Sequence, residues 1–259
     1  MTWHYWLGKS FLRIGRIIQS LAVAVMRPED LVRFSRETYR KSESLAYWTS
    51  DEFNASGLYE PEAALLERLA RKQGRLLLLG IGGGREAIPL VQAGFEVTGV
   101  DYLAEFTEAA REQARRRGLH LETLVGDISR LTLPESSFDV IWFSHAIYSF
   151  VPTRKRRIAM LQTMHHALAH GGHVVCQFHW DPELHRRRGE TRLARLLAWL
   201  TGGNIRYQAG DMLWRNSEFL HAFGLESDFT RECVEAGFKV DHLKIFEGWP
   251  RGGAILVKA

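Results

Sequence analysis

The chain has 259 residues, of which 46% are hydrophobic and 25% charged, and its formal net charge is +4. These fractions are ordinary for a soluble protein, and the length suits one α/β domain with an appendage. The sequence has no internal repeats or low-complexity segments, which excludes repeat proteins and low-complexity proteins. The charge alone does not indicate nucleic-acid binding. Two cysteines without a zinc-type Cys/His spacing predict buried free thiols, a reducing compartment and no metal site.

The amino-terminal segment, residues 1–28, carries no acidic residue, and its first acid beyond is Glu29. Its apolar residues recur every three or four positions, which places them on one face of a helix. Those residues are Trp3, Leu7, Phe11, Ile14, Ile18, Leu21 and Val25. Pro28 then stops or kinks the helix. The pattern predicts a basic amphipathic helix.

Three interpretations of this helix stay open. It can cap the core of its own domain or a dimer partner, or residues 1–26 can lie on an anionic membrane surface. A signal peptide cleaved at Ala22-Val23-Ala24 is the third, and the lack of a disulfide pattern argues against it. The longest uncharged run, 17–26, is too short to span a bilayer. We expect residues 1–44 to form a helical segment apart from a domain over 45–259.

Helical residues from about 29 to 47 link the two parts, and Pro61 suits the first turn of a helix that runs to about Arg71. Strands and helices then alternate as far as Cys176, which is typical of an α/β fold with a parallel sheet. We expect helices at 85–92, 103–117 and 154–169.

A continuous apolar run, Leu76–Leu79, leads directly into a glycine cluster at Gly80–Gly84. This pattern predicts a buried parallel strand, a tight turn and a helix N-terminus whose N–H groups can face a ligand. A second apolar strand ends in Asp101, where an acid commonly holds ribose hydroxyls. The two features predict an adenosine-type ligand. A dinucleotide fingerprint needs glycine where Arg85 stands, so an NAD-type oxidoreductase is only an alternative.

The alternation of Gly80, Gly82 and Gly84 resembles the first motif of class I S-adenosylmethionine-dependent methyltransferases. Later segments continue the resemblance in the family's order, at 124–128, 136–145, 168–176, 235–240 and 254–259. The resemblance covers roughly residues 45–259. It implies a Rossmann-like, doubly wound α/β sheet of seven strands, mostly parallel, with an antiparallel last strand.

The resemblance also implies S-adenosylmethionine as the cofactor, with S-adenosylhomocysteine as the product. In this family an acid at the position of Asp127 receives the adenine amino group, and the next residue packs on the ring. Leu78 is a departure, because many members have an acid there for the methionine ammonium. We expect Glu86 or backbone carbonyls to replace it. The expected cofactor residues are Gly80, Ile81, Gly82, Gly84, Glu86, Asp101, Tyr102, Gly126, Asp127, Ile128 and Ser144.

The alternation breaks at residues 179–223, which we expect to form a helical insertion after the fifth strand. The stretch 185–188 is rich in arginine, and the leucines that follow form an apolar face: Leu193, Leu196, Leu197 and Leu200. The insertion is either a solvated basic helix over the core or a lid that closes over the substrate.

Methyl transfer from a sulfonium is an in-line displacement, so alignment and the exclusion of water are the main tasks. Ligands of open α/β sheets lie beyond the carboxyl ends of the strands. After the fourth strand, His145 is the candidate general base and Tyr148 the candidate to orient a substrate. After the fifth strand, His179 is a third candidate. Ordinary packing or a backbone hydrogen bond is the alternative for each.

The motifs of amino-directed DNA, cytosine-C5 and protein arginine methyltransferases are missing. Ser144-His145-Ala146-Ile147 takes the place of the first, and Val175 precedes Cys176 where the second has proline. We therefore expect a small-molecule or lipid-like acceptor, methylated at O or N, and no nucleic-acid partner. The expected location is cytoplasmic, or peripheral at the inner face of the membrane. A non-catalytic module that binds the cofactor is the remaining alternative, and the sequence does not set the oligomeric state.

Overall fold

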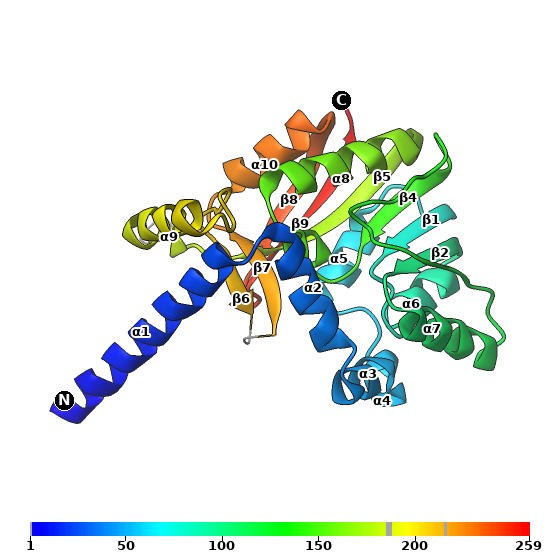
Figure 1. Ribbon diagram of the computed structural model, residues 1–259. Coiled ribbons are helices and arrows are strands. Elements are labelled where there is room, and N and C mark those ends of the chain that lie inside the picture. The colour runs from blue at the N-terminus through cyan, green and yellow to red at the C-terminus, as the bar shows by residue number, and fades with distance from the viewer. Residues whose placement is uncertain (1, 185–187, 215–216) are drawn as a thin grey trace.

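The computed structural model describes residues 2–184, 188–214 and 217–259 and shows helices packed around one twisted sheet (Figure 1). In this part of the chain the sheet has nine strands in the order β3-β2-β1-β4-β5-β7-β6, while β9 pairs with β5 and β8 pairs with β9. The Rossmann-like α/β prediction is confirmed, but the expected count of seven strands is wrong. The two additional strands are β6 (Asp211–Trp214) and β7 (Glu218–Phe223).

The parallel strands are β1 (Gly74–Leu79), β2 (Phe95–Asp101), β3 (Glu122–Val125), β4 (Phe138–Phe143) and β5 (Leu168–Trp180). β1 pairs with β2 on one side and with β4 on the other. Leu77 and Leu79 pack into the core on one face of the sheet, whereas Leu76 and Leu78 pack on the opposite face. A central strand covered on both faces requires such a continuous apolar run.

The last strand is antiparallel, as the sequence predicts. β9 (Arg251–Lys258) runs antiparallel to both β5 and β8 (Phe238–Phe246). Its register sets Arg251 opposite His179, and Ala254 opposite the buried Cys176. β9 therefore lies between β5 and β8 and sets Arg251 beside His179, near the carboxyl end of β5.

Helices cover both faces of the sheet. One face carries α8 (Arg154–Ala167) and α10 (Glu226–Glu235), and the other carries α5 (Glu60–Arg68), α6 (Ala87–Gln92) and α7 (Ala104–Arg116). The helices predicted at 85–92, 103–117 and 154–169 are thus confirmed to within two residues at each end. This layering leaves the carboxyl ends of the parallel strands as the open edge of the fold.

The segment after β5 is not wholly helical, contrary to our expectation. It contains α9 (Arg188–Thr201) and then the antiparallel hairpin of β6 and β7. β7 is buried along its whole length and joins the sheet because β5 extends beyond β4, so that His179 and Trp180 pair with Ala222 and Phe223. Residues 185–187, which belong to the arginine-rich stretch 185–188, lie outside the described residues.

The expected apolar face of α9 does not face the core. Leu196 and Leu200 are exposed, and Trp199 is 72% exposed. The smaller Ala194 and Ala198 are buried instead, because this side packs closely against another helix. That helix is α1 (Trp3–Val25) of the amino-terminal segment.

α1 projects away from the body of the protein (Figure 1). Only its carboxyl end is packed: Val23 and Ala24 are buried against α9, whereas Trp3 and Phe11 are 67% and 65% exposed. Among the described residues, no helix is both long and apolar enough to cross a membrane. α2 (Pro28–Tyr39) begins at Pro28, and α3 (Ser42–Thr49) and α4 (Asp51–Ala55) follow.

Candidate active site

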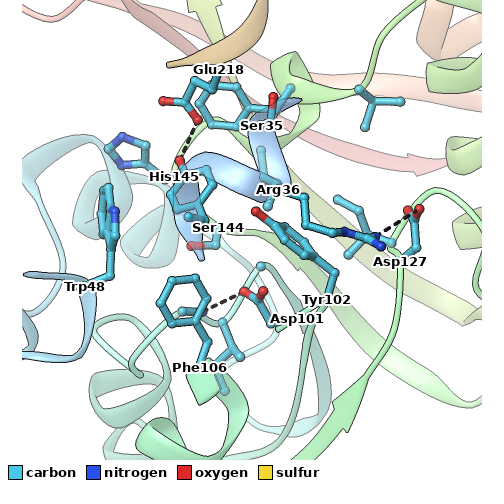
Figure 2. Close-up of a pocket in the computed structure, with 18 of the residues that line it drawn as sticks. Ser35, Arg36, Trp48, Asp101, Tyr102, Phe106, Asp127, Ser144, His145 and Glu218 are labelled. Carbon is cyan, nitrogen blue, oxygen red and sulfur yellow. Dashed lines mark hydrogen bonds and ion pairs between the residues drawn. The ribbon is translucent and has the colours of Figure 1, made fainter. Parts of the chain in front are cut away.

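A pocket lies at the carboxyl ends of β1, β2 and β4 (Figure 2). Its empty volume is about 1200 Å³, including the space at its mouth that is open to solvent. The strand ends and the loops that follow them form one wall. α2, β7 and the 3-10 helix η1 (Ile147–Phe150) supply further lining residues. The site therefore lies where open α/β sheets bind their ligands.

The glycine turn lets the backbone line this pocket. Gly80 has a φ of +78°, and a Cβ at this position would lie 2.3 Å from Cδ1 of Ile147. Gly82 donates its N–H to the Asp101 carboxylate at 3.0 Å. Gly84 does not line the pocket: its φ is +104° and it packs against Ala110 of α7. The first and second glycines thus line the pocket, and the third packs against α7.

Asp101 is buried at the end of β2 and lines the pocket. Its carboxylate also accepts the N–H of Leu103 at 3.3 Å. Burial raises the pKa of Asp101 to about 6, and the backbone N–H groups of Gly82 and Leu103 oppose that rise. The position fits a group that accepts hydrogen bonds from ribose hydroxyls.

Tyr102, Asp127 and Ile128 line the part of the pocket where the family resemblance implies adenine. The guanidinium carbon of Arg36 lies 4.9 Å from the centre of the Tyr102 ring, and its Nη2 lies 3.8 Å from Oδ2 of Asp127. Asp127 also accepts hydrogen bonds from the N–H and hydroxyl of Ser129. Gly126 is not among the lining residues; its N–H donates to the Asp101 carbonyl and joins the ends of β2 and β3.

Glu86 lines the pocket from a buried charge cluster formed by Glu62, Arg85 and Glu86. Arg85 donates to both carboxylate oxygens of Glu62 at 2.6 and 2.7 Å and also bonds Glu86. Glu86 accepts N–H groups from the Trp142 indole at 3.0 Å and the His145 backbone at 2.9 Å. Burial, and then the charge of Glu62, raise the pKa of Glu86, while Arg85 opposes the rise. A carboxyl group thus faces the pocket although Leu78 is apolar and buried.

His145 lines the pocket beside Ser144, directly after β4. Its φ of +50° is in the left-handed region, which is uncommon for a residue with a side chain and marks local strain. Both ring nitrogens contact the Arg251 guanidinium, at 2.9 and 2.5 Å. Burial, followed by the charge of Arg251, holds the pKa of His145 well below its usual range. The imidazole is therefore neutral at pH 7, and its acceptor nitrogen is engaged by Arg251.

The structure does not bring Tyr148 and His179 into the pocket. Tyr148 is fully buried behind it and donates to Glu232 at 2.6 Å, because its ring belongs to the core between the sheet and α10. His179 is buried beside Trp214, in a separate cavity at the end of β5, and burial lowers its pKa to about 3. These positions argue against the substrate contacts that we expected for both residues.

The remaining expected residues do line the pocket: Gly80, Ile81, Gly82, Glu86, Asp101, Tyr102, Asp127, Ile128, Ser144 and His145. The sequence analysis missed Gly83 and the residues that α2 and β7 contribute. From α2 these are Val32, Ser35, Arg36 and Tyr39, and from β7 it is Glu218. No motif marks them. The only signal was that residues 29–47 are helical and precede the domain directly.

Comparisons with known proteins agree with this geometry. Residues 76–172 match the family model described as a methyltransferase domain. A solved structure of an S-adenosylmethionine-dependent methyltransferase from Methanosarcina mazei has a TM-score of 0.62 at 21% identity, covering 78% of this chain and 98% of that chain.

Curated relatives point the same way. An uncharacterized methyltransferase of Schizosaccharomyces pombe is 25% identical over 76% of this chain and 73% of its own length. A demethylmenaquinone methyltransferase of Deinococcus radiodurans is 30% identical over 44% of this chain and 46% of its own length. A phosphatidylethanolamine N-methyltransferase of Cereibacter sphaeroides is 28% identical over 54% of this chain and 68% of its own length.

Proposed function

The chain belongs to the class I S-adenosylmethionine-dependent methyltransferases, and we propose that it methylates a small lipid-like acceptor at O or N. The observation that carries the acceptor class is the composition of the wall beyond the glycine turn. η1 and the residues after it contribute Ile147, Phe150, Val151 and Pro152, and α2 adds Val32. An apolar wall of this kind favours an acceptor that is itself largely apolar.

Two of the relatives support the same acceptor class. One carries the name of a demethylmenaquinone methyltransferase and the other that of a phosphatidylethanolamine N-methyltransferase. A quinone and a phospholipid both join an apolar chain to a polar head that receives the methyl group. An acceptor of that shape would set its head near Ser144 and its chain against the apolar wall.

The residues of the pocket fit the cofactor of the family. The cofactor supplies an activated methyl group on a sulfonium, which leaves as a neutral thioether. In this proposal Asp101 accepts the ribose hydroxyls, Glu86 faces the methionine ammonium, and the backbone of Gly80, Gly82 and Gly83 lines the pocket without side chains. In this proposal the chain acts mainly by aligning the acceptor with the methyl group.

We further propose that α1 holds the enzyme at the inner face of a membrane. Trp3, Trp6 and Phe11 are exposed, and Lys9 and Arg13 lie on the same helix without an acidic residue. Exposed aromatic side chains and basic groups are the combination that binds an anionic lipid surface. This location would deliver a lipid-like acceptor directly, with the domain on the cytoplasmic side.

The test combines tritiated S-adenosylmethionine with vesicles made from total bacterial lipid. We expect label in the organic phase with the intact protein and none with Asp101→Ala. Label that appears only in water-soluble products would contradict a lipid-like acceptor. For the membrane proposal, Trp3→Glu together with Phe11→Glu should lower sedimentation with vesicles that contain phosphatidylglycerol, and unchanged sedimentation would contradict the role of α1.

A further inference from the structure

We propose that Glu218 and Tyr39 form the acceptor-binding pair of this pocket and that they select an amine as the methyl acceptor. The inference rests on the proposed function, because it assigns a nucleophile and its recognition to the same pocket. Glu218 begins β7, in the segment inserted after β5, and Tyr39 ends α2 of the amino-terminal segment. Neither residue belongs to the strand ends that hold the cofactor.

The pair is held in place by two contacts between α2 and β7. The Tyr39 hydroxyl donates to Oε2 of Glu218 at 2.5 Å, and the Phe219 N–H donates to the Ser35 hydroxyl at 3.0 Å. Figure 2 shows Glu218 and Asp101 well apart among the residues that line the pocket. A head group on the acceptor side would therefore meet Glu218, while the ribose side faces Asp101.

The hydrogen bond also sets the donor and the acceptor in the pair. Burial, and then the charge of Glu218, keep the pKa of Tyr39 well above its usual range, so the phenol retains its proton. Tyr39 is consequently the donor and Glu218 the acceptor. A carboxyl group thus lies beside an aromatic ring on this side of the pocket.

The lining residues favour an amine over an alcohol. Among the described residues that line the pocket there is no lysine and one histidine, and that histidine, His145, is engaged by Arg251. The carboxyl groups of Asp101 and Glu86 already accept N–H groups of the protein, from Gly82 and Leu103 and from Trp142 and His145, so neither is available as the base that an alcohol needs. An amine needs no base at the moment of transfer, since the neutral form carries its own lone pair.

The transfer to an amine balances as follows. An ammonium first loses one proton to solvent, and the nitrogen lone pair then forms the N–C bond to the methyl group. The C–S bond breaks, and its electron pair stays on sulfur as a neutral thioether. Positive charge moves from sulfur to nitrogen, so Glu218 beside the nitrogen stabilises the transition state more than the neutral amine.

The aromatic residues around Tyr39 fit the same charge. The ring centres of Trp48 and Phe106 lie 6.0 and 6.3 Å from that of Tyr39. A cation near aromatic faces is attracted by their quadrupoles, and the methylated ammonium product carries such a charge. An aromatic group with one carboxylate thus favours an amine head over a neutral hydroxyl head.

The test measures binding and turnover with matched probes. Decylamine and decanol share one chain and differ only in the head, and ethylamine lacks the chain. Calorimetry on protein saturated with S-adenosylhomocysteine should show decylamine binding more tightly than decanol. Glu218→Gln should lower kcat/KM for decylamine about 100-fold, and Tyr39→Phe about tenfold, with the Kd of S-adenosylmethionine unchanged in both.

The exposed Glu226 of α10 provides the matched control, and Glu226→Gln should behave like the intact protein. Equal or tighter binding of decanol would overturn the choice of an amine. Full decylamine turnover by Glu218→Gln, or a loss confined to cofactor affinity, would overturn the assignment of the pair. Ethylamine binding as tightly as decylamine would instead contradict the lipid-like acceptor of the proposed function and leave the pair intact.

Discussion

The two sides of the pocket are built in different ways. The side that we assign to the cofactor (the cofactor side) consists of loops that directly follow β1, β2 and β4, so a few adjacent residues determine each contact. The side that we propose for the acceptor (the acceptor side) joins α2 to β7, and its central hydrogen bond links residues 179 positions apart. The cofactor side depends on the edge of the sheet, which proteins of one fold share. The acceptor side depends on segments added to the sheet, and such segments let proteins of one fold differ in their substrates.

Loss of the Asp101 charge should change cofactor affinity most, and so distinguish the two sides of the pocket most clearly. Asp101→Asn keeps the size of the side chain but removes a charged acceptor of ribose hydroxyls, so we expect the Kd of S-adenosylmethionine to rise about 100-fold. Glu218→Gln should leave that Kd unchanged. Calorimetric titration of both variants measures the contrast, and equal losses would show that the two sides are not separable.

Cofactor affinity should also depend on pH through the same residue. The Asp101 pKa is raised to about 6, so the carboxylate becomes protonated below that pH and affinity should fall up to about tenfold per pH unit. The effect of pH on folding has the opposite sign. A raised Asp101 pKa stabilises the folded protein fully below the ordinary pKa of an aspartate, 3.8, and this contribution is lost as the pH rises through about 6. Titrations from pH 5 to 8 should show the dependence in the intact protein and a flat profile in Asp101→Asn.

A variant of Tyr148 distinguishes a packed residue from a substrate contact. Tyr148→Phe removes a buried hydroxyl that donates to Glu232, so we expect the free energy of unfolding to fall by about 1 kcal/mol. Urea denaturation measures this change. Turnover at saturating substrates should stay within about twofold, and a large loss of kcat in a protein of normal stability would restore Tyr148 to the active site.

Substitution of Arg36 should have the smallest effect on cofactor affinity, and it should raise this affinity rather than lower it. Its guanidinium lies over Tyr102 and near Asp127, where the family resemblance places adenine. The side chain has to move for a base to stack there, and an ion pair at 3.8 Å is weak. We expect Arg36→Ala to tighten S-adenosylmethionine binding about threefold. Weaker binding in this variant would mean that Arg36 contacts the cofactor.

Local sequence patterns predicted the wall of the pocket at the strand ends well. The run of leucines before Gly80 and the spacing to Asp101 are enough to place a strand, a turn and an acid that lines the pocket, because parallel strands end at one edge. That these residues bind the cofactor stays a prediction. The same reasoning misplaced Tyr148 and His179. Position after a strand sets how close a residue is to the edge, but packing against Glu232 or Trp214 sets the direction of its side chain.

The acceptor side could not be predicted in this way. Nothing near Tyr39 indicates a partner at Glu218, and the hairpin that carries Glu218 forms because β5 extends past its neighbour. Glu86 is the intermediate case. Its role as the pocket carboxyl was expected only because Leu78 is apolar, and its burial with Arg85 and Glu62 became visible in the structure.

The contact between α2 and β7 has a further consequence for the order of events in catalysis. Leu31 is the one described residue of α2 that is buried, so we expect the helix to separate from the body at a lower free energy than the strands of the sheet. Amide hydrogens of 31–39 should therefore exchange well before those of β1. Such an opening would leave the Gly80–Gly83 turn and Asp101 in place. We then expect the cofactor to enter first, and the Tyr39–Glu218 hydrogen bond to form again around the acceptor.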